Sequence, residues 1–385
     1  MSRIAVLTPW APPADGIARH SAHLVEAFKK AGHEVLVITQ RAEASRRPTQ
    51  QGTTEVRSLL GVIPTGRAFN EVKTFGADTL FVQFAISAAS SSLFSVLNLC
   101  RRAHGSGMKV VVGFHESARE FNLLGPVSRG IYRAIARYTS TAVAFSAAGE
   151  KALLDCGLFA GVVRVPLGTH PIEQARPLAA NSVRTRYELE IPTVLCAGFT
   201  HPDKGTDLVL RVAEKVTQDL DGKVRFLIAG QPRQRRGLFR LMGQADEKFQ
   251  IRLEQMAKES HGVNFLFCRY IPDEDIHEVM RQAAVVVLPY RSITQSGIAN
   301  LALSSGAAIV ASDIQGLAGE LEDAAAYFSV DDTAGLAETL VSVLSDGVLS
   351  AQLRVLAIEK AGEQSYERVA ELIIATALAP ANGVR

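Results

Sequence analysis

A lysine follows an apolar run near the middle of the chain, in a loop where a phosphate group can be bound. The segment 193–197 is expected to be a buried strand, and Gly198, Thr200 and Lys204 stand between it and the next helix, which Thr206 or Asp207 is expected to cap. A lysine at the carboxyl end of a strand can donate a charge-assisted hydrogen bond to a phosphate oxygen. The alternative is an ordinary lysine in a surface loop.

A second candidate phosphate site lies at 283–313, where an apolar strand, a loop, a helix and another apolar strand are expected. The strand stops at Pro289, Ser296 and Gly297 open the helix, and Gly306 ends it. A glycine lets an oxyanion approach the backbone, where unpaired N–H groups and the helix dipole favour negative charge. A side chain at position 297 would obstruct that approach.

The amino-terminal half offers a histidine and a further glycine at similar places. Gly16, Arg19 and His20 stand between a strand and a helix, and His115 and Glu116 follow the apolar run 109–113. A histidine at a strand's carboxyl end can donate to a sugar hydroxyl, although a packed histidine with a backbone partner is the alternative. Glu116 is a candidate polar contact for a second substrate.

Metal and disulfide chemistry are not expected. Asp273 and Asp275 follow Pro272 and precede a helix, so helix capping explains them better than metal binding does. His20 and His23 share a helix face without an obvious third ligand. The four cysteines stand far apart in apolar surroundings, which suggests neither a zinc site nor a disulfide framework.

Composition indicates a soluble globular protein with two domains. The chain has 385 residues, of which 47% are hydrophobic and 21% charged, and its formal net charge of +2 gives no overall attraction to nucleic acid. The first apolar run is short and ends before Pro9, so it is interpreted as the first strand of a cytoplasmic protein. Arginines clustered at 233–240 favour a polar helix face; the alternative is a docking surface for anionic lipid or an acidic acceptor.

Short apolar runs alternate with helical patterns, first over 4–165 and again over 193–328. This alternation is typical of an α/β protein, and the predicted fold is two doubly wound Rossmann-like domains that face a cleft. The expected divisions are an amino-terminal domain 1–172, a linker 173–188, a carboxyl-terminal domain 189–362 and a final helix 363–385 that crosses back to the first domain.

The order of these motifs resembles that of the retaining GT-B glycosyltransferases of family four. The resemblance covers nearly the whole chain and depends on the order of loose motifs. They are the glycine loop at Gly16, His115 after the fourth expected strand, Pro166-Leu-Gly168, the run from Gly198 to Asp207 with Lys204-Gly205, Pro289-Tyr290 with the Ser296-Gly297 helix start, and Ser312 to Glu320.

The resemblance implies a role for each matched residue. Gly16 faces the donor diphosphate, His115 lies beside the donor sugar, and Lys204 contacts the diphosphate together with the backbone of Ser296, Gly297 and Ile298. It also implies that Tyr270 or Ile271 borders the nucleotide base. Arg19, His20 and Glu116 are the acceptor-side candidates. Retention in such enzymes is ascribed to front-face attack, with the leaving phosphate accepting the acceptor's proton.

Three positions depart from the family pattern. Phe199 stands where an arginine is common, and Ile293 and Leu301 stand where the family commonly has two glutamates. Leu301 cannot accept from ribose hydroxyls, and it is expected on a buried helix face. Thr294, Gln295, Ser296 and Asn300 are the available polar substitutes.

The predicted function is therefore a metal-independent, retaining transfer of a hexose or N-acetylhexosamine to a hydroxyl acceptor. No cofactor is expected; the co-substrate is a nucleotide-diphosphate sugar, with UDP or GDP expected. The acceptor is a sugar, a lipid-linked intermediate or a small molecule, and contact with the inner face of a membrane is a further expectation, whereas nucleic acid is not an expected partner. Two alternatives remain: a sugar-nucleotide epimerase, and a non-catalytic homologue that acts as a partner of another transferase.

Overall fold

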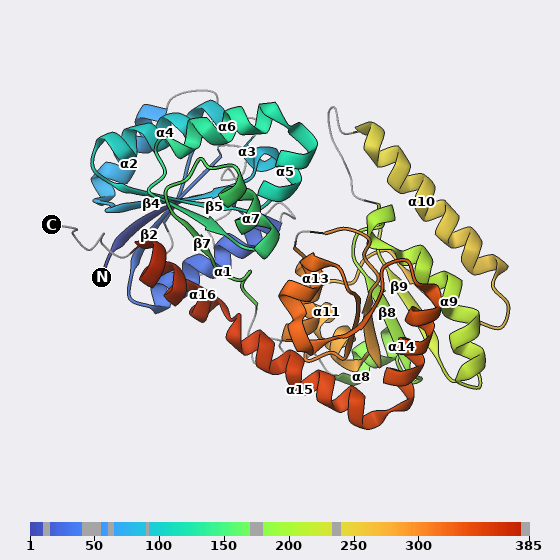
Figure 1. The fold of residues 1–385 in the computed structure, drawn as a ribbon. Helices are drawn as coiled ribbons and strands as arrows, with labels where there is room; N and C mark the ends of the chain where they lie inside the picture. Colours follow the sequence, from blue (N-terminus) through green and yellow to red (C-terminus); the bar gives the residue numbers. More distant parts are fainter. Residues whose placement is uncertain are drawn as a thin grey trace. The chain divides into compact units, whose positions relative to one another are not determined.

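The protein divides into two compact units in the computed structural model (Figure 1). Unit 1 comprises Met1–Gly168 and Gln364–Arg385, and unit 2 comprises Thr169–Glu363. The structure describes residues 1–10, 16–40, 55–60, 65–89, 92–169, 180–232, 240–293 and 295–378.

Unit 1 is built on a seven-stranded sheet in which every described pairing is parallel. The sheet has the order β3-β2-β1-β4-β5-β6-β7. The strands are β1 (Arg3–Leu7), β2 (Glu34–Gln40), β3 (Glu55–Leu60), β4 (Thr79–Phe84), β5 (Lys109–Phe114), β6 (Thr141–Ala144) and β7 (Val162–Arg164).

Helices cover both faces of this sheet because successive strand residues point to opposite faces, and both faces are apolar. Ala5 packs with α2, α4 and α6, whereas Ile4 packs with α1 and α16 (Figure 1). The helices are α1 (Gly16–Lys30), α2 (Thr65–Phe75), α3 (Ile86–Ala89), α4 (Leu93–Gly105), α5 (Ser117–Leu124), α6 (Pro126–Ala136), α7 (Ala147–Asp155) and α16 (Tyr366–Ile373), the last continued by a π turn, Ile374–Leu378.

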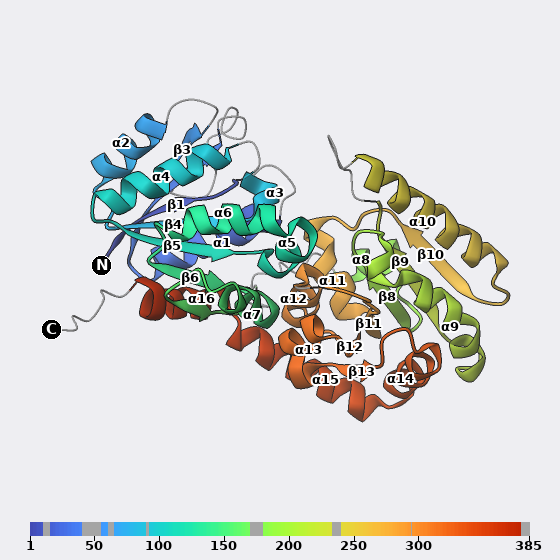
Figure 2. The ribbon, with the colours of Figure 1, turned by 45° about the horizontal axis from the view of Figure 1, so that its top comes forward.

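Unit 2 repeats this plan with a six-stranded parallel sheet of order β10-β9-β8-β11-β12-β13 (Figure 2). The strands are β8 (Thr193–Ala197), β9 (Arg225–Ala229), β10 (Asn264–Cys268), β11 (Val285–Leu288), β12 (Ile309–Ser312) and β13 (Ala326–Phe328).

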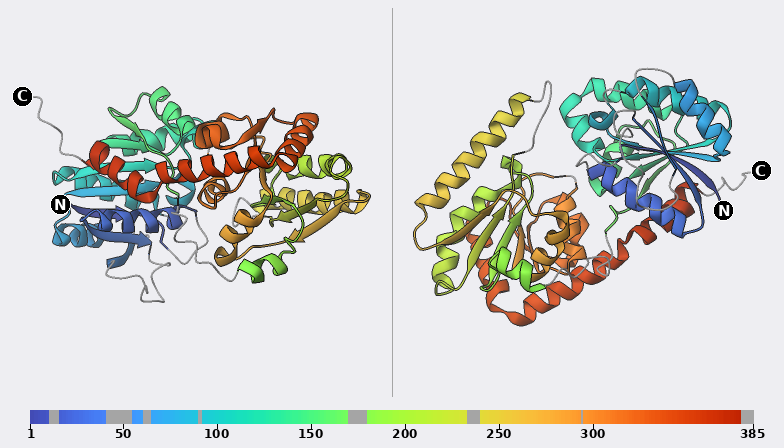
Figure 3. Two further views of the ribbon diagram at one scale, coloured as in Figure 1. Left: turned by 90° about the horizontal axis from the view of Figure 1, so that it is seen from below. Right: turned by 180° about the vertical axis from the view of Figure 1, so that it is seen from behind.

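The helices of unit 2 also lie on both faces of their sheet. Leu195 packs with α8, α11, α12 and α13, whereas Val194 packs with α9, α10 and α14 (Figures 2 and 3). They are α8 (Ala180–Arg186), α9 (Thr206–Asp219), α10 (Arg240–Glu259), α11 (Asp273–Gln282), α12 (Gly297–Ser304), α13 (Gln315–Leu321), α14 (Thr333–Ser345) and α15 (Gly347–Glu363), with short 3₁₀ turns η2 (Pro202–Lys204) and η4 (Glu322–Ala324).

Several expected elements differ in detail from the observed ones. The sequence interpretation missed β3 and α2, so the strand before His115 is β5 and not the fourth strand. Part of the expected linker 173–188 is helix α8, whose Val183 packs in the core of unit 2; residues 170–179 lie outside the described part of the chain. The final segment packs on α1, where Lys30 forms an ion pair with Glu367.

Each sheet has one place where the strand order reverses direction along the chain. In unit 1 it lies between β1 and β4, and in unit 2 between β8 and β11. Ligands of doubly wound sheets bind outside the carboxyl ends of the strands at such points. The loops after these four strands are therefore the first places to look for a site.

Helices long and apolar enough to cross a bilayer were sought among the described residues. No single helix meets that standard; α14 and α15 meet it only as a pair, bent by 95° at their junction.

Candidate active site

Unit 2 has a pocket at the reversal point of its sheet. It brings together three predicted donor-site residues, Gly198, Thr200 and Lys204, which stand after β8. The other lining residues come from β8, the end of β9 and the residues that follow β11: Cys196, Ala197, Phe199, Thr206, Ile228, Ala229, Gly230 and Tyr290.

Lys204 is held at this pocket by a turn that only a glycine can complete. It ends η2, and the next residue, Gly205, has a φ of 61°. A Cβ on Gly205 would lie 1.8 Å from the carbonyl oxygen of Pro289, so a larger residue is excluded there. The Lys204 ammonium lies 3.7 Å from the centre of the Tyr290 ring, and burial lowers the pKa of Lys204 to about 8.

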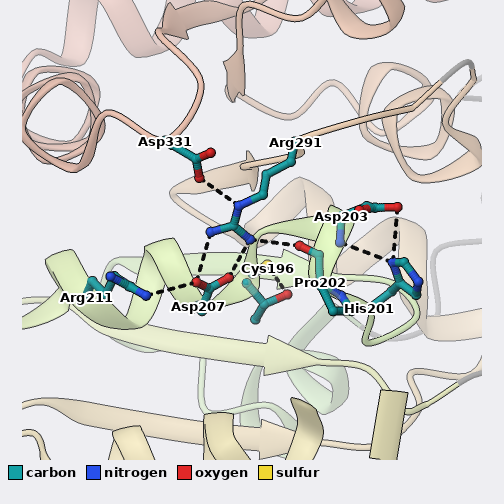
Figure 4. Close-up of polar contacts among 9 residues, drawn as sticks. Cys196, His201, Pro202, Asp203, Asp207, Arg211, Arg291 and Asp331 are labelled. Carbon is teal, nitrogen blue, oxygen red and sulfur yellow. Dashed lines mark hydrogen bonds and ion pairs between the residues drawn. The ribbon is translucent and has the colours of Figure 1, made fainter. Parts of the chain in front are cut away.

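An arginine beside the pocket fixes the turn that carries Lys204 (Figure 4). Arg291 donates two hydrogen bonds to the buried Asp207 carboxylate, at 2.8 and 2.9 Å, and one to the carbonyl of Pro202 at 2.8 Å. Its third partner is Asp331, at 2.7 Å. The expectation that Asp207 or Thr206 caps α9 is wrong: Gly205 is the N-cap residue, and Asp207 serves Arg291 instead.

The start of α12 holds a carboxylate of the protein itself. The backbone N–H of Ser296 points to both oxygens of Glu320, at 3.1 and 3.2 Å, and the Ser296 hydroxyl accepts from the N–H of Ala299. Burial raises the pKa of Glu320 to about 8, although the Ser296 N–H and the nearby Lys204 cation both oppose that rise. The Ser296 N–H, which the sequence predicted to bind a diphosphate, therefore already has Glu320 as its acceptor.

Two further residues predicted to contact the diphosphate lie at the same helix end. Gly297 is exposed, a Cβ there would meet no atom within 4 Å, and its φ is not positive. The Ile298 side chain approaches Gly198 at the pocket, where a Cβ on that glycine would lie 3.3 Å from it. Within the helix, the N–H groups of Gly297 and Ile298 have no acceptor, as at any helix start.

The other predicted donor residues are dispersed. Tyr270 is 60% exposed, whereas Ile271 is buried in the core of unit 2. Gln295 is partly buried, and Thr294 lies outside the described residues. Thr200, by contrast, lines the pocket, and its hydroxyl donates to Gln250 at 2.7 Å.

Two of the three departures from the family pattern have a packing explanation, whereas Phe199 is 49% exposed and lines the pocket. Ile293 and Leu301 are partly buried and pack against the core of unit 2. Leu301 is thus less buried than the sequence predicted. The substitute Asn300 is buried, and neither its amide nitrogen nor its amide oxygen has a hydrogen-bond partner in the structure.

His115 lies in a buried aromatic cluster of unit 1. It stacks on Phe145 at 4.6 Å between ring centres, and its Nε2 donates to Oε1 of Gln83 at 2.6 Å. Burial lowers the pKa of His115 to about 3, so its ring is neutral at physiological pH. The nitrogen that would donate to a sugar is therefore already bonded to Gln83.

His20 belongs to the same cluster. It is 4% exposed and meets the rings of His115, Phe145 and Tyr366 at 5.4, 5.0 and 5.5 Å. Neither of its ring nitrogens has a hydrogen-bond partner in the structure. Burial lowers the pKa of His20 well below the usual range, and the nearby His115 lowers it further. The predicted acceptor contact at His20 is thus an enclosed, neutral imidazole.

The remaining predicted residues of unit 1 are more open. Gly16 starts α1 with open space around it, and Arg19 is exposed on the same helix. Glu116 accepts from Ser87 at 3.2 Å and pairs with Arg119. A small pocket lies near the reversal point of this sheet, lined by Leu7, Thr8, Pro9, Val82, Gln83, Phe84, Ala88, Ala89, Ser92 and Val96.

The described residues contain no group of three or more histidine, cysteine or acidic side chains that could hold a metal ion. Asp275 is buried and pairs with Arg186 and Tyr187. Pro272, not an acidic side chain, occupies the N-cap of α11. All four cysteines are free thiols. Of the arginine cluster at 233–240, residues 233–239 lie outside the described residues, and Arg240 begins α10.

Sequence reasoning missed four residues that shape these clusters: Gln83, Tyr290, Arg291 and Glu320. Arg291 and Tyr290 directly follow Pro289, so their place after a buried strand was the available signal. Glu320 stands in a quoted motif, but only the fold shows that it reaches the start of α12.

Each unit matches the model of a known protein family. Residues 14–171 match the model of Glycosyltransferase Family 4, and residues 191–346 match that of Glycosyl transferases group 1. The chain belongs to the family 4 glycosyltransferases, with the GT-B fold. Enzymes of this class transfer sugars, which agrees with a pocket that gathers a lysine, glycines and a helix start.

The chain is also similar to one curated protein in sequence and to several solved structures in fold. The chain is 25% identical to a phosphatidyl-myo-inositol mannosyltransferase of Mycolicibacterium smegmatis, over 97% of this chain and 92% of that protein. Its fold is similar to that of sucrose-phosphate synthase from Thermosynechococcus elongatus, with a TM-score of 0.73 and 16% identity over 97% of both chains. Anabaena HepE in complex with UDP and glucose has a TM-score of 0.74 and 14% identity, over 99% of this chain and 100% of that one.

Proposed function

We propose that the protein is a retaining glycosyltransferase that moves a hexose or N-acetylhexosamine from a nucleotide-diphosphate sugar to a hydroxyl acceptor. The observation that carries this proposal is the buried Lys204 in the pocket after β8, β9 and β11. A buried ammonium group has lost its hydration, so a nearby negative charge stabilises it more than it would stabilise an exposed one. A leaving diphosphate supplies that charge.

The chemistry needs charge stabilisation more than a protein nucleophile. The bond between the anomeric carbon and the phosphate oxygen breaks, and a bond from the acceptor oxygen to that carbon forms on the same face of the sugar. The acceptor's proton passes to the leaving phosphate. Lys204 donates to a diphosphate oxygen as its charge develops, and the N–H groups at the start of α12 act in the same direction.

The proposed donor carries UDP or GDP. HepE has been solved with UDP and glucose, and the structure of an E. coli trehalose-6-phosphate enzyme contains UDP-2-fluoro glucose. The proposed acceptor is a polysaccharide intermediate, a glycolipid or a natural product, since the mannosyltransferase relative is named for phosphatidyl-myo-inositol. We further propose that the enzyme works in the cytoplasm, at the inner face of a membrane, without a metal ion or other cofactor.

Thermal shift with UDP-, GDP- and dTDP-sugars tests donor binding. A donor present at a hundredfold its dissociation constant stabilises the folded protein by about 2.7 kcal/mol. The anomeric configuration of the product, read by NMR, then tests retention, and EDTA treatment tests metal independence. Loss of activity in EDTA that manganese or magnesium restores would contradict the metal-independent mechanism.

A second candidate function is a non-catalytic partner of another transferase. The apolar packing of Ile293 and Leu301 favours it, because these positions commonly carry glutamates in the family. Donor binding without turnover on a broad acceptor panel would support this candidate. Conversion of the donor alone, without an acceptor, would instead indicate a sugar-nucleotide epimerase.

A further inference from the structure

A continuous path of contacts leads from the start of α12 to Lys204. The Ser296 hydroxyl donates to the Tyr290 hydroxyl at 3.3 Å, and its backbone N–H donates to Glu320. The Tyr290 ring in turn lies 3.7 Å from the Lys204 ammonium. Tyr290 thus touches both groups that the diphosphate is proposed to meet.

The ring of Tyr290 attracts the Lys204 ammonium without neutralising its positive charge. The face of an aromatic ring is electrically negative, and a cation above it is stabilised most when both have lost water. Tyr290 is only 1% exposed, and Lys204 lines the same pocket. The ring therefore limits the rotamers of a flexible lysine while leaving its N–H groups available to a ligand.

The backbone of Tyr290 is fixed as firmly as its ring. Its carbonyl accepts from the Ser312 hydroxyl at 2.6 Å, at the end of the neighbouring strand β12. The next residue, Arg291, donates its backbone N–H to the carbonyl of Asp203, directly before Lys204. Tyr290 is therefore anchored between β12 and the turn that carries the lysine.

We propose that Tyr290 is a positioning residue of the diphosphate site: its ring holds the Lys204 ammonium in place, and its hydroxyl ties that ring to the start of α12 through Ser296. This inference rests on the proposed function, because it assigns a role within the same donor site. Glu320 completes the arrangement by holding the Ser296 N–H.

Affinity for UDP and GDP, measured by calorimetry, tests this role. Tyr290→Leu removes the ring face and is expected to weaken binding about five- to thirtyfold, as the loss of a desolvated cation–π contact would. Tyr290→Phe keeps the ring but loses the hydrogen bond to Ser296, so it is expected to weaken binding by no more than about threefold. Tyr187→Leu is the matched control, because Tyr187 is a buried tyrosine of unit 2 that does not line the pocket.

A double-mutant cycle separates positioning from general support of the fold. If Tyr290 acts through Lys204, Tyr290→Leu has little further effect in a Lys204→Ala background. Full additivity of the two effects, or unchanged binding in Tyr290→Leu, overturns the inference. Binding that Lys204→Ala leaves intact contradicts the proposed function itself, whereas a Lys204→Ala effect with a silent Tyr290→Leu contradicts only the role of Tyr290.

Fold loss is controlled separately. Circular dichroism and the melting temperature are recorded for each variant, and Tyr290→Met replaces Tyr290→Leu if the leucine variant does not fold. Methionine keeps an adaptable apolar side chain but lacks the ring face. Its expected loss of affinity is the same, and unchanged affinity overturns the inference in the same way.

Discussion

The two units bury polar groups in opposite ways at corresponding ends of similar sheets. Unit 1 encloses His20 and His115 among aromatic rings, and burial keeps both imidazoles neutral. Unit 2 encloses the Lys204 ammonium in a turn that the ion pair of Arg291 with Asp207 fixes, although burial favours the neutral form of Glu320 beside it. The two sheets share one order over six strands, yet this order carries a neutral cluster in unit 1 and a charged one in unit 2.

The contrast suggests a division of substrate chemistry between the units. A charged cluster suits a diphosphate, whose binding needs a cation and N–H donors. The imidazoles of unit 1 add no charge, but both are enclosed, and Nε2 of His115 is already bonded to Gln83.

Among the charged residues, the largest expected effect concerns the ion pairs of unit 2. Arg291→Ala leaves the buried Asp207 with Arg211 at 3.6 Å as its remaining ion-pair partner, and is expected to lower the free energy of unfolding by about 2 to 3 kcal/mol. Urea denaturation measures the change. Arg211→Ala is the control, with an expected loss below about 1 kcal/mol because Arg211 is more exposed. Equal losses in both variants would show that Arg291 does not hold the site.

The next effect is on catalysis. Lys204→Ala is expected to lower kcat/KM about ten- to hundredfold, because one charge-assisted hydrogen bond to the diphosphate is lost. Steady-state kinetics with the identified donor measures it. Lys215→Ala is the control, since Lys215 is exposed and pairs with Asp219 at 2.9 Å, outside the pocket. Unchanged kinetics in Lys204→Ala would remove the main support for the proposed site.

The sequence predicted features that depend on neighbouring residues, but it did not predict contacts between residues far apart along the chain. Local apolar patterns predicted β8 with its observed bounds, and glycine and lysine spacing predicted that Gly198 and Lys204 share a site. Glu320 stands 24 residues from Ser296, and no local pattern connects them. His115 shows the converse limit, because its position after a strand was predictable but its enclosure by Phe145 was not.

The third prediction is that mild acid affects the two units in opposite directions. A histidine with a lowered pKa stays neutral when folded but binds a proton when unfolded, so unit 1 loses stability as the pH falls below 6.5 toward 3. Each such histidine contributes at most about 1.4 kcal/mol per pH unit in that window. Glu320 binds a proton when folded but not when unfolded, so its contribution to unit 2 rises as the pH falls from about 8 to 4.5.

The single tryptophan makes the acid response of unit 1 measurable. Trp10 is buried in the core of unit 1, so its fluorescence during urea unfolding at pH 7 and pH 5 reports that unit. Hydrogen exchange of peptides from β8 and β11 reports unit 2. His20→Leu is expected to reduce the acid sensitivity of unit 1, although Glu120, whose pKa burial raises, opposes the histidines there. An unchanged pH response in His20→Leu would contradict the neutral-cluster interpretation.

The smallest expected effect on stability comes from Gly297, which separates ligand binding from folding at the start of α12. A methyl group there meets open space, and the backbone is not left-handed, so Gly297→Ala is expected to change the free energy of unfolding by less than about 0.5 kcal/mol.

Gly297→Val adds a larger obstacle on the same exposed side and is expected to weaken UDP and GDP binding while the melting temperature of the free protein changes little. Gly205→Ala is the opposite case, because its Cβ would overlap the Pro289 carbonyl and unit 2 is expected to unfold. If Gly297→Val binds both nucleotides with normal affinity, the diphosphate does not lie at the start of α12, and the charged cluster around Lys204 has some other use.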